Sequence, residues 1–358
     1  MELKSEYMRT EEKVIFALRE LYSKYGYAQF KMSKFEEYDL YVRNKDFLVS
    51  DSVITFNDTN GRLMALKPDV TLSIIKNSAE TESVQKLYYN ENVYRVSKNT
   101  HSFKEIMQTG LECIGALGTY NICEVVTLAA KSLAAISENF VLDISHMGLI
   151  SSVLEGIDSE TKKEILQYIS EKNTHDLVAL CDKENIDSSI IVALINVSGT
   201  AQEIKQKLAA IPFGENSKDA IYEINTVSDI LSSLPENDKI HFDFSIVNDM
   251  NYYSGIVFKG YIEGIPTGIL SGGRYDLLMN KMGKKTGAIG FAVYLDFLER
   301  FMEETKEYDT DILLLYNDTD KLSEVLKTVD TLTSQGSRVL AQTSVPEGLK
   351  YKTLLRFE

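Results

Sequence analysis

The chain has 358 residues, of which 44% are hydrophobic, so it can bury a sizeable core and form two or three domains. Its formal net charge of -15 argues against broad electrostatic attraction to nucleic acid or to anionic membranes. The three cysteines form no C-x-x-C pair, which is typical of a protein of the reducing cytoplasm. The start lacks the apolar core of a signal peptide, and no apolar run approaches the ~18 residues of a membrane span. We therefore predict a cytoplasmic protein without a membrane partner.

The N-terminal segment combines a helix with an extended piece. Thr10 precedes two glutamates, a typical helix start, and apolar residues then repeat at helical spacing from Val14 to Tyr25. Gly26 suits the left-handed end of such a helix. Residues 27–38 are predicted to be extended.

Two short apolar runs, at 53–56 and 63–66, flank a polar segment that ends in Asn60-Gly61. This dipeptide marks a β-turn, so the two runs are predicted to form a hairpin. The hairpin leads into KPDVT at 67–71, where a proline ends the strand pairing and a helix follows. The side chains of this segment are therefore expected at the mouth of a sheet.

Residues 87–115 predict a second hairpin, because β-branched and aromatic residues alternate on both sides of the polar loop 97–102. Arg95 lies at the end of the first strand, and Gln108 and Glu112, four residues apart, face the same way from the second. A guanidinium, an amide and a carboxylate on one sheet face could hold a small zwitterion. A solvated sheet face remains the alternative at this point.

The middle of the chain changes to helical patterns. The run at 121–124 resembles a capping box that opens a helix reaching to about 137. The segment from about 148 to 234 is interpreted as a helical insertion rather than a continuation of the sheet. Its helices are predicted at 161–169, 174–181, 201–208 and 217–234.

Strands are predicted again at 240–247, 252–261 and 267–270. The pair Gly272-Gly273 follows the last of them and permits close approach of a ligand or a tight entry into the next helix, with a plain turn as the alternative.

A strand at 287–293 and a helix at 295–304 complete the main part of the chain, and residues 309–358 are predicted to form a small C-terminal α/β appendage of strand, helix, strand and a weaker extended piece. Strand pairs on both sides of a helical insertion indicate an α+β fold with a mostly antiparallel sheet flanked by helices.

Motifs for phosphate, metal or nucleophilic chemistry are lacking in the sequence. The GKKT at 283–286 does not have the G-x-x-x-x-G-K-[ST] spacing, the four histidines are scattered, and no G-x-S-x-G occurs. We therefore predict no metal site.

Several segments resemble, in order and spacing, the catalytic core of the histidyl-tRNA synthetases. The resemblance covers about residues 10–300 and implies the class II aminoacyl-tRNA synthetase-like fold, usually in a dimer. The matching segments are KPDVT at 67–71, NVYR at 92–95, QTGLECIG at 108–115, NYYSGIVFKG at 251–260, SGGRYD at 271–276 and GAIGFAVYLDFL at 287–298.

The departures from that family concern the nucleotide. Ser97 stands where the synthetases have the glutamate that reads adenine, Phe297 where they have an arginine for the triphosphate, and Asn248 where they have the arginine of histidine activation. Adenylation needs cations where charge develops on the phosphates. We therefore predict no catalytic residues, no cofactor, no ligase activity and no tRNA partner.

The histidine-binding positions of the family are retained. The resemblance implies that Asp69 binds the α-ammonium group of the ligand and that Arg95 is available for its carboxylate. Glu112, Tyr253 and Tyr275 match the groups that recognise the imidazole and close the pocket. The resemblance therefore implies free histidine as the ligand. The predicted histidine-binding residues are Asp69, Thr71, Arg95, Gln108, Glu112, Tyr252, Tyr253 and Tyr275.

This combination resembles the regulatory subunits of short-form ATP phosphoribosyltransferase, which are synthetase paralogues. The segments 141–150 and 242–258, and the helical segment after Met147, look closer to that family than to true synthetases. The resemblance implies a non-catalytic subunit that is required for the activity of a short catalytic subunit and takes part in histidine feedback inhibition. It also implies that this subunit forms a dimer within a hetero-octamer. Lys67 replaces a usual arginine, and the proline of the first motif is missing around 31–35.

The predicted organisation is a synthetase-like core at 1–147 and 239–306, a helical insertion at 148–238 and the C-terminal domain at 307–358. Two other functions are compatible with the sequence. One is a divergent histidyl-tRNA synthetase, and the other is a free-standing histidine-sensing protein.

Overall fold

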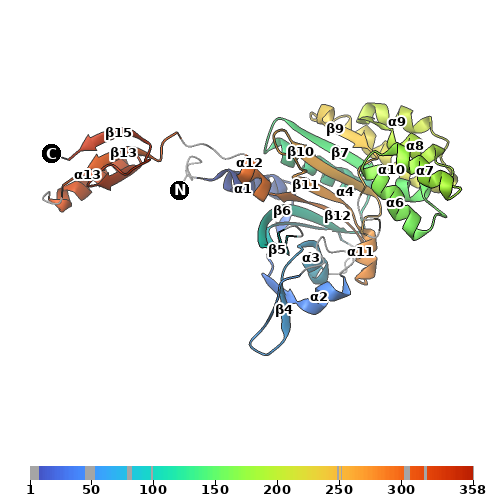
Figure 1. Cartoon of the computed structure of the whole chain (residues 1–358), viewed down its shortest axis with the longest axis horizontal. Coiled ribbons are helices and arrows are strands. Elements are labelled where there is room, and N and C mark those ends of the chain that lie inside the picture. Colours follow the sequence, from blue (N-terminus) through green and yellow to red (C-terminus); the bar gives the residue numbers. More distant parts are fainter. Residues whose placement is uncertain are drawn as a thin grey trace. The chain divides into compact units, whose positions relative to one another are not determined.

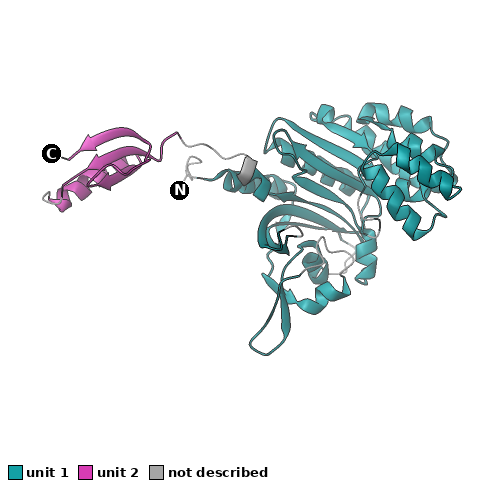
Figure 2. Cartoon of the chain, in the orientation of Figure 1, with its two compact units in different colours: residues 1–302 teal, residues 303–358 magenta. Residues whose placement is uncertain are grey.

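The computed structural model describes residues 8–44, 53–78, 83–97, 100–247, 250, 252–301, 307–317 and 321–357. The chain divides into two compact units, residues 1–302 and residues 303–358, which are described separately (Figure 2). Within the described residues, no helix is long and apolar enough to cross a membrane.

A nine-stranded sheet organises the first unit (Figure 1). Neighbouring strands are antiparallel except at the β1–β5 and β7–β9 pairs, which are parallel. The predicted α+β fold with a mostly antiparallel sheet is thus confirmed. In spatial order the strands are β1 (Ala28–Gln29), β5 (Gln85–Val96), β6 (Phe103–Gly115), β12 (Gly287–Tyr294), β11 (Leu270–Arg274), β10 (Ile256–Ile262), β7 (Phe140–His146), β9 (Ile240–Asp243) and β8 (Ser198–Thr200).

Two helices, α1 (Thr10–Lys24) and α4 (Thr119–Ala134), pack on one face of this sheet. Leu111 and Cys113 of β6 are completely buried in the same apolar cluster as the inner residues of these helices. Because side chains alternate along a strand, the even-numbered residues of β6 face the opposite side. On that side, Ile114 packs in a second cluster with α3 (Thr71–Asn77) and α11 (Asp276–Lys281).

A small antiparallel sheet projects from the first unit (Figure 1). Its strands are β2 (Phe35–Glu37), β4 (Leu63–Leu66) and β3 (Thr55–Asn57), and α2 (Tyr38–Arg43) follows β2. The predicted β3–β4 hairpin is confirmed, and Gly61 in its turn has a φ of 77°. The helix end predicted at Gly26 is also confirmed, with a φ of 81° there.

The segment after β7 is mainly helical, as predicted, but it also contributes a strand to the main sheet, which the sequence pattern did not indicate. Strand β8 lies within this segment and pairs antiparallel with β9, so it extends the main sheet. The four predicted helices are present, and α5, α8 and β8 were not predicted. The helices are α5 (Met147–Val153), α6 (Ser159–Ser170), α7 (Thr174–Lys183), α8 (Ser189–Ile195), α9 (Ala201–Ala209) and α10 (Lys218–Leu231).

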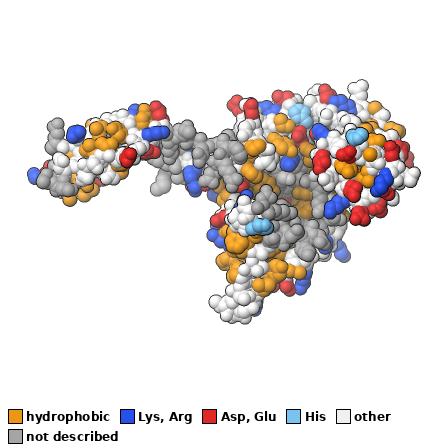
Figure 3. Space-filling model, viewed as in Figure 1, with side chains coloured by type: hydrophobic (Ala, Val, Ile, Leu, Met, Phe, Trp, Pro, Cys, Tyr) orange, Lys and Arg blue, Asp and Glu red, His pale blue; other side chains and the backbone are white. Residues whose placement is uncertain are grey.

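Acidic and basic side chains are interspersed over the surface of these helices (Figure 3). The domain limits at 148, 239 and 307 stay predictions.

Four local expectations were wrong. The strand predicted at 240–247 ends at Asp243. Helix α4 begins at Thr119, because the Asn121 side chain accepts a hydrogen bond from the Gly118 N–H (3.0 Å) and so lies inside the first turn. Strand β10 begins at Ile256, and the residues just before it form a connection rather than a strand. Gly272 and Gly273 lie within strand β11 and not after it.

The second unit has a three-stranded parallel sheet in the order β14-β13-β15. The predicted sequence of strand, helix, strand and extended piece is confirmed. Its elements are β13 (Thr310–Leu315), α13 (Leu322–Ser334), β14 (Val339–Gln342) and β15 (Tyr351–Arg356), and helix α12 (Asp296–Phe301) ends the described part of the first unit.

Candidate functional site

The strand register places Glu112 in line with two glycines on the face of the sheet away from α4. Glu112 of β6 lies opposite Gly290 of β12, which lies opposite Gly273 of β11. A Cβ atom at Gly290 would lie 1.8 Å from Glu112 Oε2, and one at Gly273 would lie 2.8 Å from the ring of Tyr253. The glycines therefore provide the space that the carboxylate and the ring occupy.

Glu112 is the buried acid of this site, with 2% of its surface exposed. Thr71 donates a hydrogen bond to Glu112 Oε1 (2.8 Å) and Tyr275 donates one to Oε2 (2.5 Å). Burial raises the pKa of Glu112 to about 8, although the two hydrogen bonds oppose this shift. The side chain can therefore accept or donate a proton near neutral pH.

Three tyrosines form an aromatic wall next to Glu112. The ring centroids of Tyr252 and Tyr253 are 4.5 Å apart, and those of Tyr252 and Tyr275 are 5.8 Å apart. Burial raises the pKa of all three phenols, so they remain protonated hydrogen-bond donors at physiological pH.

Asp69 and Arg95 meet at the start of α3. The Leu72 N–H donates a hydrogen bond to Asp69 Oδ1 (2.9 Å), and Arg95 Nε donates one to the carbonyl oxygen of Pro68 (3.0 Å). Burial raises the pKa of Asp69, while the nearby charges of Arg95 and Lys67 act in the opposite direction. Both charged groups thus lie at the end of the site formed by the 67–71 segment.

Gln108 contributes an unsatisfied donor. It is 3% exposed, and among the described residues its Nε2 has no hydrogen-bond partner. Its strand neighbours are Glu91 and Tyr294. A buried amide without an acceptor costs free energy, and a ligand carrying an acceptor would remove that cost.

Direct contacts join five of the eight predicted site residues, Thr71, Glu112, Tyr252, Tyr253 and Tyr275. Asp69, which is two residues before Thr71, and Arg95 lie beside this group, and Gln108 shares the Glu112 face of β6.

Tyr89 was not among the predicted site residues. It is 1% exposed, and Glu112 and Asp69 both act electrostatically on its phenol. The alternation along β5 places Tyr89 on the same face as Arg95, which was the signal in the sequence that could have identified it.

The positions that depart from the synthetases carry no cation. The Ser97 hydroxyl accepts a hydrogen bond from the Thr100 N–H (3.4 Å), and Phe297 packs against the main core with its ring 6.4 Å from that of Tyr294. Asn248 lies outside the described residues. Within those residues, no group of three His, Cys, Asp or Glu side chains is arranged to hold a metal ion.

Curated relatives of the chain are named regulatory subunits. The ATP phosphoribosyltransferase regulatory subunit of Alkaliphilus metalliredigens is 28% identical over 334 residues, covering 89% of this chain and 84% of the relative. That of Clostridium kluyveri is 29% identical over 317 residues, covering 84% and 81%. The predicted resemblance to this group is confirmed.

Solved structures share the fold. The ATP phosphoribosyltransferase regulatory subunit/histidyl-tRNA synthetase of Bacillus halodurans has a TM-score of 0.79 at 24% identity and covers 97% of this chain and 93% of that one. A chain of the ATP phosphoribosyl transferase complex of Thermotoga maritima has a TM-score of 0.64 at 19% identity, covering 79% and 96%. The family model described as histidyl-tRNA synthetase matches residues 1–298, and the chain therefore belongs to that family.

Proposed function

We propose that this chain is the non-catalytic regulatory subunit of a short-form ATP phosphoribosyltransferase, in the first step of histidine biosynthesis. The observation that carries the proposal is a contrast within one scaffold. The buried polar side chains of Thr71, Gln108 and Glu112 share one face of this scaffold, which supports an amino-acid ligand, whereas Ser97 and Phe297 offer no charge to a nucleotide triphosphate.

Free histidine is the proposed ligand of this site. Asp69 receives its ammonium group, Arg95 and Gln108 bind its carboxylate, and Glu112 accepts a hydrogen bond from the imidazole. Support comes from the unsatisfied Gln108 amide and from the pKa of Glu112, which is raised to about 8 by burial and therefore close to the range in which an imidazole exchanges protons.

The proposed partner is a short catalytic subunit, in a hetero-octamer that contains a dimer of this chain. Histidine bound to this chain lowers the activity of the partner through a coupling free energy of about 1–3 kcal/mol. Support comes from the regulatory subunits that resemble the chain over most of its length.

The test is to mix the full chain with a short catalytic subunit and to measure phosphoribosyl transfer from phosphoribosyl pyrophosphate to ATP, with and without histidine. We expect a gain in activity on mixing and a loss on adding histidine. No gain on mixing would leave a free-standing histidine sensor, and histidine-dependent exchange of pyrophosphate into ATP by the chain alone would indicate a synthetase.

A further inference from the structure

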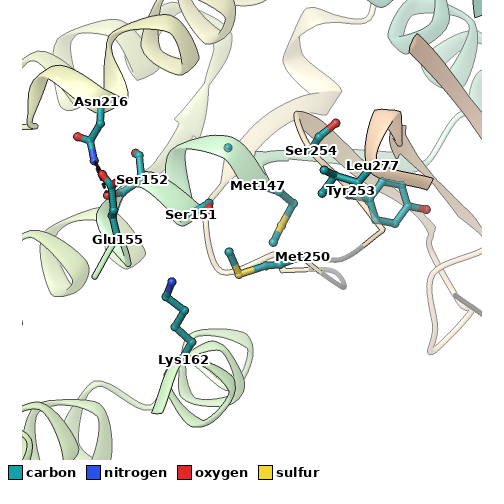
Figure 4. A pocket seen from close by; sticks show the side chains of 11 residues that line it. Met147, Ser151, Ser152, Glu155, Lys162, Asn216, Met250, Tyr253, Ser254 and Leu277 are labelled. Carbon is teal, nitrogen blue, oxygen red and sulfur yellow. Dashed lines mark hydrogen bonds between the residues drawn. The ribbon is translucent and has the colours of Figure 1, made fainter. Parts of the chain in front are cut away.

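A groove of about 400 Å³ lies beside the candidate histidine site (Figure 4). We name it the Met147 groove. Helices α5, α6 and α11 contribute to its walls, together with Met250, Tyr253 and Ser254. Its main side chains are Met147, Ser151, Lys162, Met250, Tyr253 and Leu277.

One part of the groove is apolar. The side chains of Met147 and Met250 lie close together, and Tyr253 and Leu277 lie to one side of them (Figure 4). Leu277 is 41% exposed, so the apolar wall is open to solvent. Methionine side chains adapt to the shape of whatever packs on them, which suits a surface that receives a segment of another protein.

The other part carries the ammonium group of Lys162. Lys162 points from α6 toward the groove (Figure 4), and within the described residues it forms no ion pair. Glu155, the carboxylate in the wall, accepts a hydrogen bond from Asn216 Nδ2 (2.5 Å). Among the described residues, the wall thus carries the unpaired ammonium group of Lys162 and the carboxylate of Glu155, whose partner is a neutral amide, next to apolar side chains. A complementary occupant has a large apolar side chain, and an acidic one where it faces Lys162.

Tyr253 belongs both to this groove and to the candidate histidine site. From it, ring contacts lead through Tyr252 to Tyr275, whose hydroxyl donates to Glu112. A ligand that changes the position of Glu112 or of these rings would change the wall of the groove. Regulation requires an element whose position both ligands bias, and Tyr253 is the residue that the groove and the candidate histidine site share.

We propose that the Met147 groove docks a segment of the catalytic subunit that carries an acidic residue and a large apolar residue. This inference rests on the proposed function of the chain. An open groove fits a protein segment better than a small metabolite, because sites for small molecules enclose most of the ligand surface. The arrangement places the partner one tyrosine away from histidine.

The experiment uses the full chain, a short catalytic subunit and the variant Lys162→Glu. We expect the variant to bind the catalytic subunit at least tenfold more weakly, while histidine binding by the variant alone is unchanged in calorimetry. The matched control is Lys163→Glu, the same charge reversal at the neighbouring exposed position outside the groove, which should bind within about twofold of the unaltered chain. Leu277→Asp tests the apolar wall independently and should also weaken binding.

The outcomes separate the two proposals. If the unaltered chain neither binds nor activates the catalytic subunit, the proposed function fails and the occupant proposed here fails with it. If the unaltered chain binds and activates, but Lys162→Glu and Leu277→Asp behave like it, only the groove assignment is overturned. Sedimentation measures whether Lys162→Glu changes the self-association of the chain. Such a change, with unchanged affinity for the catalytic subunit, would assign the groove to a second copy of the chain and would also overturn the groove assignment.

Discussion

At the scale of single residues, the burial of Glu112 has opposite consequences for the stability of the fold and for the proposed binding of histidine. Its carboxyl group is buried among tyrosines, and burial raises its pKa to about 8. Its two oxygens accept hydrogen bonds from Thr71 and Tyr275. Polar groups buried in this way destabilise a fold but provide selective binding, because a ligand that leaves them unpaired is rejected.

Replacing Glu112 by Gln should weaken histidine binding by a few-fold to about tenfold, since the protonated carboxyl is neutral near pH 7 and a hydrogen bond to a neutral group contributes about 0.5–1.5 kcal/mol. Calorimetry with histidine measures the effect. The control is Glu105→Gln, the same change on the exposed end of β6. Equal affinities for the two variants would contradict the role of Glu112.

The pH dependence of stability follows from the same residue. Glu112 has a pKa of about 8 in the folded chain and about 4.3 when unfolded. Between these values the folded state holds a proton that the unfolded state has lost, so this residue makes stability fall as pH rises from about 4.5 to 8.

Urea unfolding at several pH values should show that Glu112→Gln removes part of this slope and is more stable than the unaltered chain at pH 8. A slope that is identical in both proteins would show that Glu112 is not the group responsible.

At the scale of elements, one arginine joins the helical segment to the sheet. Arg274 of β11 donates from Nε to Asp276 (2.7 Å) and from a terminal nitrogen to Glu223 of α10 (3.4 Å). Glu223 Oε1 also lies 3.8 Å from Nε2 of the buried His146. Burial alone would raise the pKa of Glu223, but His146 and Arg274 together lower it.

Replacing Arg274 by Met should destabilise the first unit by about 1–3 kcal/mol, because the partly buried carboxylate of Glu223 would lose the guanidinium beside it. Urea denaturation of the full chain measures this loss. The control is Arg62→Met, which removes an exposed pair with Glu37 and should cost less than about 0.5 kcal/mol. Similar losses in both variants would show that burial does not distinguish the two ion pairs.

Most of the elements were predictable from the sequence because their patterns are local. The hairpin of β5 and β6 follows from strict alternation, and its alternation also placed Arg95, Gln108 and Glu112 on one face. The start of α4 was missed because the rule assigns Asn121 to the cap itself, whereas its side chain reaches back to Gly118 from the first turn. Strand β8 has three residues, which is too short to show a period.

The contacts within the site could not be predicted from spacing. Glu112 and Tyr275 are 163 positions apart, and only the register of β6, β12 and β11 brings them together. The predicted histidine-binding residues were chosen by their resemblance to a family. The space that Gly290 and Gly273 leave for Glu112 and Tyr253 appears only in the fold.

At the scale of the whole molecule, the second unit is stabilised by an ion pair of its own, between Arg338 and Asp311. Arg338 donates two side-chain hydrogen bonds to Asp311 (3.0 and 3.1 Å), and this contact lowers the pKa of Asp311 to about 2. The pair therefore stabilises the unit above pH 4, and this contribution is lost as pH falls toward about 2.

The variant Asp311→Asn should lower the protection of β13 and β14 a few-fold at neutral pH, because the partly exposed pair makes a modest contribution. The difference from the unaltered chain should shrink as the pH falls below 4. Hydrogen–deuterium exchange of peptides from these strands in the full chain, corrected for intrinsic rates, measures both effects. A difference that is the same at pH 6 and pH 3 would contradict the role of the carboxylate.

Strand β8 also limits how this chain can change during evolution. Gly199 pairs with Phe242, so residues of the helical segment form the backbone hydrogen bonds along one edge of β9. A recombination event that exchanged the helices alone would leave β9 as an open edge, which invites pairing with other chains. Any replacement segment must therefore contain a short strand that pairs with β9, whereas its helices are free to diverge.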